Sequence, residues 1–255
     1  MDKLHNFASI SDFISSDTLL ELKQECFSIS NYPGSEKNFW FSFDRPPSNI
    51  IEDYIWKASN HIGFDSSIIG AEWWVRCFTK SFMDHPFHID LDVSSSVEEN
   101  IIKTPKFSSV LYLTNDGGPT VITNSAKYEE AEKFDFYPST PSVVWVSNPK
   151  AGKFIYWSKT YIHGVFGGKN FVEPRTTLMF NLWTEKPKYP ECRTYDLPHK
   201  ISQSSATLNS TDYDIIKPVL GQEDTYLKIK GDRNMVKCKL VNGLPAMGTY
   251  MVVNS

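Results

Sequence analysis

The sequence predicts a mainly β protein with a helical N-terminal part, whose strands form a double-sheet jelly roll. The chain has 255 residues, 40% of them hydrophobic and 14% aromatic, which is enough for one large core. Helical spacing of apolar residues ends near Ile62. From Gly70 on, short runs rich in β-branched and aromatic residues are separated by Gly/Pro turns. A jelly roll suits such strands because it leaves few open edges.

Two helices are expected before Gly70. For the first, Thr18 and Glu21 fit a capping box, and three apolar residues then recur on one face: Leu19, Leu22 and Cys26. The second should run from about Ser48 to Ile62, after the stop signal Pro46-Pro47. Its apolar residues also recur at helical spacing: Ile51, Tyr54, Ile55, Ala58 and Ile62.

The strands of the predicted jelly roll follow. They are expected at residues 71–78, 107–114, 120–123, 142–146, 154–157 and 175–183. The chain turns polar past Trp183. We therefore predict one unit at residues 1–186, the helical prefix plus the jelly roll, and a C-terminal extension at 187–255, packed on the core or appended to it.

Charge and cysteine content narrow the class of protein. The formal net charge is −4 and the chain has no basic block, so a nucleic-acid partner is not expected. The four cysteines lie far apart without a C-x-x-C pair, which argues against a cysteine zinc site. No apolar leader follows Met1 and no stretch could span a bilayer. We expect a cytoplasmic protein with reduced thiols and no membrane contact, and we leave the oligomeric state open.

The segment His88-Ile89-Asp90 is the strongest chemical signal. Residues i and i+2 of a strand point to the same face, so His88 and Asp90 can offer a nitrogen and an oxygen ligand to one metal ion. His163, expected in a loop after a strand, would complete two histidines and one carboxylate, the facial triad of non-haem iron(II) oxygenases. Asp92, which has the parity of Asp90, and His85 are the competing ligands within the same segment.

The strand that begins at Arg175 has two different faces. Its even residues are apolar, whereas its odd residues include Arg175, Thr177 and Asn181, a mixture that suits the wall of a cavity. A buried arginine needs an anion, because an unpaired buried charge is very costly. A carboxylate bound in a bidentate manner would satisfy it.

The order His88-x-Asp90, then a distant His163, then Arg175 twelve residues later resembles the iron(II)/2-oxoglutarate-dependent dioxygenase family. The resemblance implies a double-stranded β-helix, the jelly-roll or cupin-like core. It implies Fe(II) at the two histidines and the aspartate, and the distal carboxylate of 2-oxoglutarate at Arg175 and Thr177. O2 would be the second co-substrate, and ascorbate would stimulate the reaction.

One further residue follows from the same resemblance. The run Val110 to Thr114, followed by Gly117-Gly118, looks like a strand and turn of the prolyl-hydroxylase-like branch. Tyr112 would then complete the co-substrate pocket. A purely structural role as a core aromatic is the alternative.

The expected activity is the oxidation of an unactivated C–H bond in a small metabolite or amino-acid-like substrate, by hydroxylation, desaturation or oxidative cyclisation. Three alternatives stay open: a peptide or protein hydroxylase of the same family, a cupin-like metalloenzyme that does not use 2-oxoglutarate, and a non-catalytic jelly-roll binding module. Several strand residues are candidates for the substrate pocket: Trp73, Trp74, Arg76, Asn181 and Trp183.

Overall fold

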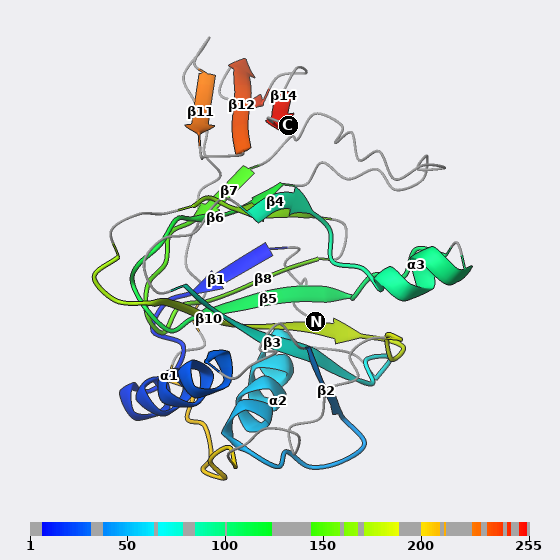
Figure 1. Cartoon of the computed structure of the whole chain (residues 1–255), viewed down its shortest axis with the longest axis vertical. Helices are drawn as coiled ribbons and strands as arrows, with labels where there is room; N and C mark the ends of the chain where they lie inside the picture. Colours follow the sequence, from blue (N-terminus) through cyan, green and yellow to red (C-terminus); the bar gives the residue numbers. More distant parts are fainter. Residues whose placement is uncertain are drawn as a thin grey trace.

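Two antiparallel sheets face each other, and two helices cover the outer face of the larger sheet (Figure 1). This arrangement confirms the mainly β fold with a helical N-terminal part and a double-stranded β-helix core. The computed structural model describes residues 7–31, 38–63, 66–78, 85–99, 101–123, 144–158, 161–167, 171–188, 200–209, 212, 226–230, 234–241, 244–245 and 250–253.

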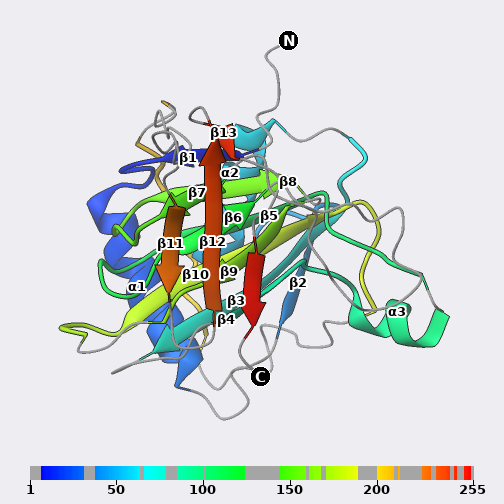
Figure 2. The ribbon, with the colours of Figure 1, turned by 90° about the horizontal axis from the view of Figure 1, so that it is seen from above.

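The larger sheet has the strand order β1-β8-β5-β10-β3-β2. The long strands β3, β10 and β5 run side by side (Figure 2). Four of the six strands were predicted, whereas β1 and β2 are four residues each, too short to show an alternating pattern. The bounds are β1 (Phe7–Ile10), β2 (Phe39–Ser42), β3 (Gly70–Phe78), β5 (Phe107–Tyr112), β8 (Phe154–Ser158) and β10 (Arg175–Trp183).

The smaller sheet has the order β4-β9-β6-β7. Its strands are short: β4 (His85–His88), β6 (Thr120–Thr123), β7 (Val144–Ser147) and β9 (Ile162–Val165). The expectation of a loop at His163 is wrong, because the residue lies within β9, which pairs with β4 on one side and β6 on the other. A four-residue strand that contains a glycine gives little sequence signal, and pairing on both edges is what makes it extended.

Helix α1 (Ser16–Ser30) begins one turn earlier than its predicted cap. Ser15 is the N-cap, and its Oγ accepts a hydrogen bond from the backbone N–H of Thr18 at 3.2 Å. The predicted capping box at Thr18 and Glu21 is therefore wrong. Thr18 instead lies inside the helix, where its Oγ1 accepts a hydrogen bond from the N–H of Thr207 at 2.8 Å.

The N-terminus of helix α2 (Ile50–Ile62) is capped by several side-chain hydrogen bonds. The Asn49 side chain accepts from the N–H of Glu52 at 3.0 Å, and the buried Glu52 carboxylate accepts from the N–H of Ser48 at 2.9 Å. Both oxygens of Glu52 also accept from Arg45, at 2.7 and 2.8 Å. The helix ends at Gly63, whose φ of 74° is the left-handed conformation that glycine adopts without strain.

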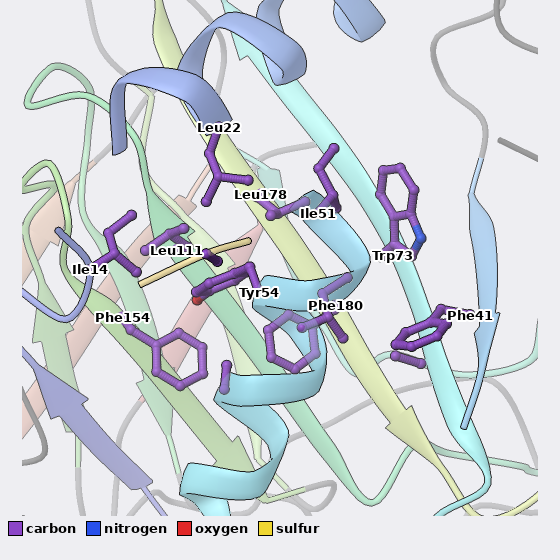
Figure 3. Packing of buried hydrophobic residues seen from close by; sticks show 14 of the residues in the cluster. Ile14, Leu22, Phe41, Ile51, Tyr54, Trp73, Leu111, Phe154, Leu178 and Phe180 are labelled. Atoms are coloured by element: carbon purple, nitrogen blue, oxygen red, sulfur yellow. The ribbon is translucent and has the colours of Figure 1, made fainter. Parts of the chain in front are cut away.

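The main hydrophobic core lies between these two helices and the larger sheet (Figure 3). Tyr54 of α2 meets Phe154 and Phe180 of the sheet edge to face, with ring centroids 6.3 and 6.2 Å apart. Leu178 and Phe180 confirm the apolar even face predicted for β10, because both are fully buried in this core. The odd residues of β10 therefore point to the opposite side of the sheet.

A short helix, α3 (Val93–Glu99), projects at one end of the two sheets in both ribbon views (Figures 1 and 2). It was not predicted. None of the helices in the described ranges is long and apolar enough to cross a membrane.

Part of the predicted C-terminal extension packs on the helical side of the larger sheet. Leu208 forms a β-bridge with Ile14, and the N–H of Ala206 donates to Asp53 of α2 at 2.7 Å. Further along, β11 (Tyr226–Lys230), β12 (Asn234–Val241), β13 (Leu244–Pro245) and β14 (Tyr250–Val253) form an antiparallel sheet of their own. The division of the chain at 186/187 stays a prediction.

Candidate metal centre and co-substrate pocket

A cavity of about 480 Å³ lies between the two sheets. Its walls come from the odd face of β10, the facing side of β3 and β5, and the strands β4 and β9 of the smaller sheet. Five of the six predicted site residues line it: His88, Asp90, His163, Arg175 and Thr177.

The two histidines are neighbours because of strand register. His88 of β4 pairs directly with His163 of β9, and their ring centroids are 4.3 Å apart. Side chains at paired positions of antiparallel strands point to the same face of the sheet. Two imidazoles that are 75 residues apart in the sequence therefore meet at one point of the cavity wall.

Asp90 lies just after the end of β4 and completes the group. One carboxylate oxygen is 3.5 Å from Nε2 of His88, and the other is 3.7 Å from Nε2 of His163. Ser108 of β5 donates a hydrogen bond of 2.7 Å to the second oxygen and fixes the orientation of the carboxylate. The ligand atoms of all three residues lie within 4.8 Å of one another.

This group has the chemistry and spacing of a metal site. Two ligands at about 2.1 Å from one ion are about 3 to 4 Å apart, and both distances that involve Asp90 fall in this range. Burial lowers the pKa of His163 to about 3, so its imidazole is neutral at physiological pH and can donate a lone pair. Burial opposes ionisation of Asp90, but His163, His88 and the Ser108 hydroxyl outweigh it and hold the pKa of Asp90 well below its usual range.

Neither competing ligand, Asp92 or His85, belongs to the three-ligand group. Asp92 is the N-cap of α3: its carboxylate accepts from the N–H and the Oγ of Ser95, and from the N–H of Lys188. It is buried among these donors and does not line the cavity. The predicted alternation fails past His88 because β4 ends there, and for the same reason Leu91, expected on the opposite face, lines the cavity. His85 lies on the cavity wall, with its ring 4.6 Å from that of His88, outside the three-ligand group.

Arg175 and Thr177 lie on another part of the same wall. The Arg175 side chain is 4% exposed, and burial lowers its pKa while leaving the guanidinium charged. Gly117 makes room for it, because a Cβ there would lie 2.2 Å from Cδ of Arg175. A Cβ on the neighbouring Gly118 would lie 1.9 Å from the carbonyl oxygen of Phe166, so this glycine allows two backbone segments to approach closely. The buried Oγ1 of Thr177 has no hydrogen-bond partner among the described residues.

Tyr112 lies beneath this wall. It pairs with Thr177 across β5 and β10, yet it is fully buried and does not line the cavity. Its hydroxyl lies 2.8 Å from Oγ1 of Thr120 and 3.2 Å from the carbonyl oxygen of Ser147. Thr120, which sequence reasoning missed, does line the cavity. The co-substrate role of Tyr112 stays a prediction.

A second polar group, also missed from the sequence except for Asn181, lies farther along the cavity. Glu72 of β3 is 7% exposed, and its carboxylate accepts from Asn38 at 2.6 Å and from Nε1 of Trp183 at 3.1 Å. Burial and the charge of Asp90 raise the pKa of Glu72 to about 7. Asn181 pairs with Glu72 across β10 and β3, and its buried Oδ1 has no hydrogen-bond partner among the described residues.

The predicted pocket tryptophans divide between the two faces of the sheet. Trp74 and Arg76 line the cavity with Asn181, as expected. Trp73 does not, because its parity places it in the core, where it stacks on Phe39 with ring centroids 4.4 Å apart. Trp183 is buried next to the cavity rather than on its wall and reaches it through its hydrogen bond to Glu72.

Comparison with known proteins found similarity only at the level of solved structures. No protein-family profile matches the sequence, and no curated protein matches it. A prolyl-4-hydroxylase from Pseudomonas putida is 16% identical, with 71% of this chain and 89% of that chain covered and a TM-score of 0.46. An oxidoreductase of the 2OG-Fe(II) oxygenase family from Burkholderia pseudomallei is 12% identical, with 71% and 86% covered and a TM-score of 0.41.

The third structure is the non-heme alpha ketoglutarate dependent epimerase SnoN from nogalamycin biosynthesis. It is 10% identical, with 69% of this chain and 78% of that chain covered and a TM-score of 0.44. The solved structures to which this chain is similar thus include those of 2OG-Fe(II) oxygenases, at identities of 16% or below.

Proposed function

We propose that this chain is an iron(II)- and 2-oxoglutarate-dependent oxygenase that oxidises an unactivated C–H bond of a small metabolite or amino-acid-like substrate. One observation carries the proposal: a single cavity has a three-ligand metal group on one part of its wall and a buried arginine beside a threonine hydroxyl on another. Hydroxylation is the default outcome, and desaturation or oxidative cyclisation would use the same site.

The ligand set fits iron(II). Two neutral imidazoles and one carboxylate from His88, His163 and Asp90 bind one side of an ion and leave other positions open. Iron(II) with 2-oxoglutarate and O2 would supply the oxidising power when bound, with succinate and CO2 as the products of the co-substrate.

The chain's own residues would hold the co-substrate and keep the site dry. The buried guanidinium of Arg175 can donate two parallel hydrogen bonds to a carboxylate, and the Thr177 hydroxyl can donate a third. Between these residues and Asp90 the wall is apolar, formed by Val110, Met179 and Trp74. Water exclusion by such a surface strengthens each electrostatic contact in the cavity.

The first test is a pair of binding titrations under anaerobic conditions. We expect one iron(II) per chain in the wild type, and 2-oxoglutarate binding to the iron-loaded protein. His88→Ala should abolish iron binding, whereas Arg175→Leu should weaken 2-oxoglutarate at least about a hundredfold, because it removes a buried charge partner, and should spare iron. If the Arg175→Leu protein binds iron(II) and 2-oxoglutarate with the affinities of the wild type, the proposed role of Arg175 is contradicted.

The second test is succinate release with iron(II), ascorbate and 2-oxoglutarate, screened against candidate substrates. Stimulation by amino acids or small metabolites supports the proposal, and stimulation by peptides alone would indicate a peptide hydroxylase. Oxygen consumption without any need for 2-oxoglutarate would indicate a cupin-like metalloenzyme instead. If His88→Ala left the metal affinity unchanged, the protein would be a non-catalytic jelly-roll binding module.

A further inference from the structure

Glu72 belongs to a row of paired residues that crosses the larger sheet and also contains Ser108, the residue that orients Asp90. Ser108 pairs with Asn181 across β5 and β10, and Asn181 pairs with Glu72 across β10 and β3. Adjacent strands are about 4.8 Å apart, so the backbones at Ser108 and Glu72 are about 10 Å apart. Glu72 lines the cavity, and the Ser108 hydroxyl donates to Asp90 of the metal group.

This row is too far from Thr177 to belong to the co-substrate pocket. Thr177 and Asn181 are four residues apart on one strand, or about 13 Å at 3.3 Å per residue. Four carbon–carbon bonds of about 1.5 Å give a five-carbon dicarboxylate a length of at most about 6 Å. A 2-oxoglutarate molecule held at Arg175 and Thr177 is therefore shorter than the separation of the two rows, so Asn181 and Glu72 are left for the second molecule of the reaction.

Two residues of the row offer acceptor oxygens to the cavity. Asn181 Oδ1 is buried, lines the cavity and accepts no hydrogen bond from any residue in the described part of the chain. Glu72 is more than nine-tenths buried, and its donors among the residues that the structure describes, Asn38 and Trp183, are neutral. A buried carboxylate near Asp90 with these neutral donors is costly to ionise, and a cation would compensate its charge.

We propose that Glu72 and Asn181 bind an ammonium group of the substrate, so that the oxidised molecule is an amine or an amino acid with a free amino group. This inference rests on the proposed function for its reaction, although the binding itself needs only the cavity. The ammonium would lie across the sheet from Ser108, which donates to the metal ligand Asp90.

The test uses the Trp183 indole as a reporter, because its N–H donates to Glu72. The full chain is titrated at pH 8 with n-propylammonium and, separately, with 1-propanol, a neutral molecule of the same size. We expect a saturable shift of the Trp183 indole N–H resonance with the ammonium only, in the millimolar range that so small a ligand allows. No saturable shift below about 100 mM, or an equal shift with propanol, would overturn the inference.

Two variants and a control locate the binding. Glu72→Gln keeps the shape and removes the charge, so it should weaken the ammonium at least about tenfold, and Asn181→Leu should weaken it by a similar factor. Glu185→Gln makes the same change in net charge at an exposed position and should leave the affinity unchanged. Wild-type affinity in folded Glu72→Gln and Asn181→Leu proteins would also overturn the inference.

The titration is repeated after zinc(II), a redox-inactive substitute for iron, and 2-oxoglutarate have been added. If zinc and 2-oxoglutarate do not bind but the ammonium does, the proposed function fails and the amine site stands. If zinc and 2-oxoglutarate bind but the ammonium does not, the amine site fails alone.

Discussion

Gly117 leaves room for the Arg175 side chain, and replacing this glycine with alanine tests the co-substrate role of the guanidinium. Gly117 has a φ of 113°, which favours glycine, and a Cβ there would lie 2.2 Å from Cδ and 2.7 Å from Nε of Arg175. Carbon atoms in contact are about 3.5 Å apart. The Arg175 side chain must therefore move by about 1.3 Å, or the turn at Gly117 must move instead.

A displacement of this size breaks the geometry of a bidentate pair. Hydrogen bonds between a guanidinium and a carboxylate are about 2.8 Å long, and a shift of more than 1 Å removes at least one of them. A hydrogen bond to a charged group contributes about 1.5 to 3 kcal/mol, so Gly117→Ala should weaken 2-oxoglutarate binding about tenfold to a hundredfold. The metal ligands come from β4, β9 and the residues after β4, so iron affinity should stay within about twofold of the wild type.

Gly152 offers a matched control for backbone strain. Its φ is 80°, but a Cβ there would be 3.9 Å from its nearest neighbour, so Gly152→Ala adds strain of about 1 kcal/mol without a clash. Calorimetric titration of 2-oxoglutarate into both iron-loaded variants under anaerobic conditions, with urea unfolding to measure stability, separates the two effects. The reasoning is wrong if folded Gly117→Ala binds 2-oxoglutarate like the wild type, or if Gly152→Ala weakens it equally.

Three further results are expected. Ser108→Ala should weaken iron(II) binding about tenfold, because Asp90 loses the hydrogen bond that orients it, and an unchanged dissociation constant in a metal titration would argue against this. Glu52→Ala should lower the free energy of unfolding in urea by about 2 to 4 kcal/mol, since it removes the buried acceptor of Arg45 and Ser48; a loss below about 1 kcal/mol would contradict it. The metal-free protein should lose up to about 3 kcal/mol of stability as the pH rises from 4.5 to 7, because folded Glu72 keeps its proton until about pH 7 while the unfolded chain releases it near 4.5. In the Glu72→Gln protein, the free energy of unfolding in urea should no longer fall with pH over this range. An unchanged pH dependence would refute the raised pKa of Glu72 as its cause.

Strand parity was the part of the site that the sequence alone could supply. In β10, the alternation of Arg175, Thr177 and Asn181 with buried Leu178 and Phe180 follows from the two-residue period of an extended chain. No knowledge of the neighbouring strands is needed for that prediction. It succeeded because the strand is nine residues long and buried on its apolar face.

The parts that parity could not supply depend on where each strand ends and on what lies beside it. Asp92 has the same parity as Asp90 in the sequence, but β4 ends at His88, and the Asp92 carboxylate is the N-cap of α3. Tyr112 was placed correctly on a strand, yet its hydroxyl meets Thr120 and Ser147. The register that brings His88 opposite His163 is set by the pairing of two four-residue strands, which no local pattern encodes.

Glu72 was not among the predicted site residues, for a different reason. A lone glutamate between Ala71 and Trp73 suggests a solvated position on a strand, because buried carboxylates are rare. Its burial is tolerable only because Asn38 and Trp183 donate to it, and those partners come from 34 residues before it and 111 residues after it. Sites built on such long-range polar contacts are the ones that composition and spacing miss.

The three long strands of the larger sheet place the two polar ends of the cavity in a fixed order. Thr177 pairs with Arg76 and Tyr112 at one end, and Asn181 pairs with Glu72 and Ser108 at the other. Between them lies a row of three apolar side chains, Met179 with Trp74 and Val110. A ligand that spanned this row would need a polar group at each end and hydrocarbon between them, whereas two separate ligands would each need only one polar end. Because a five-carbon dicarboxylate is shorter than the separation of the polar rows, the register of β10 favours two ligands, with an anion at Arg175 and an ammonium at Glu72.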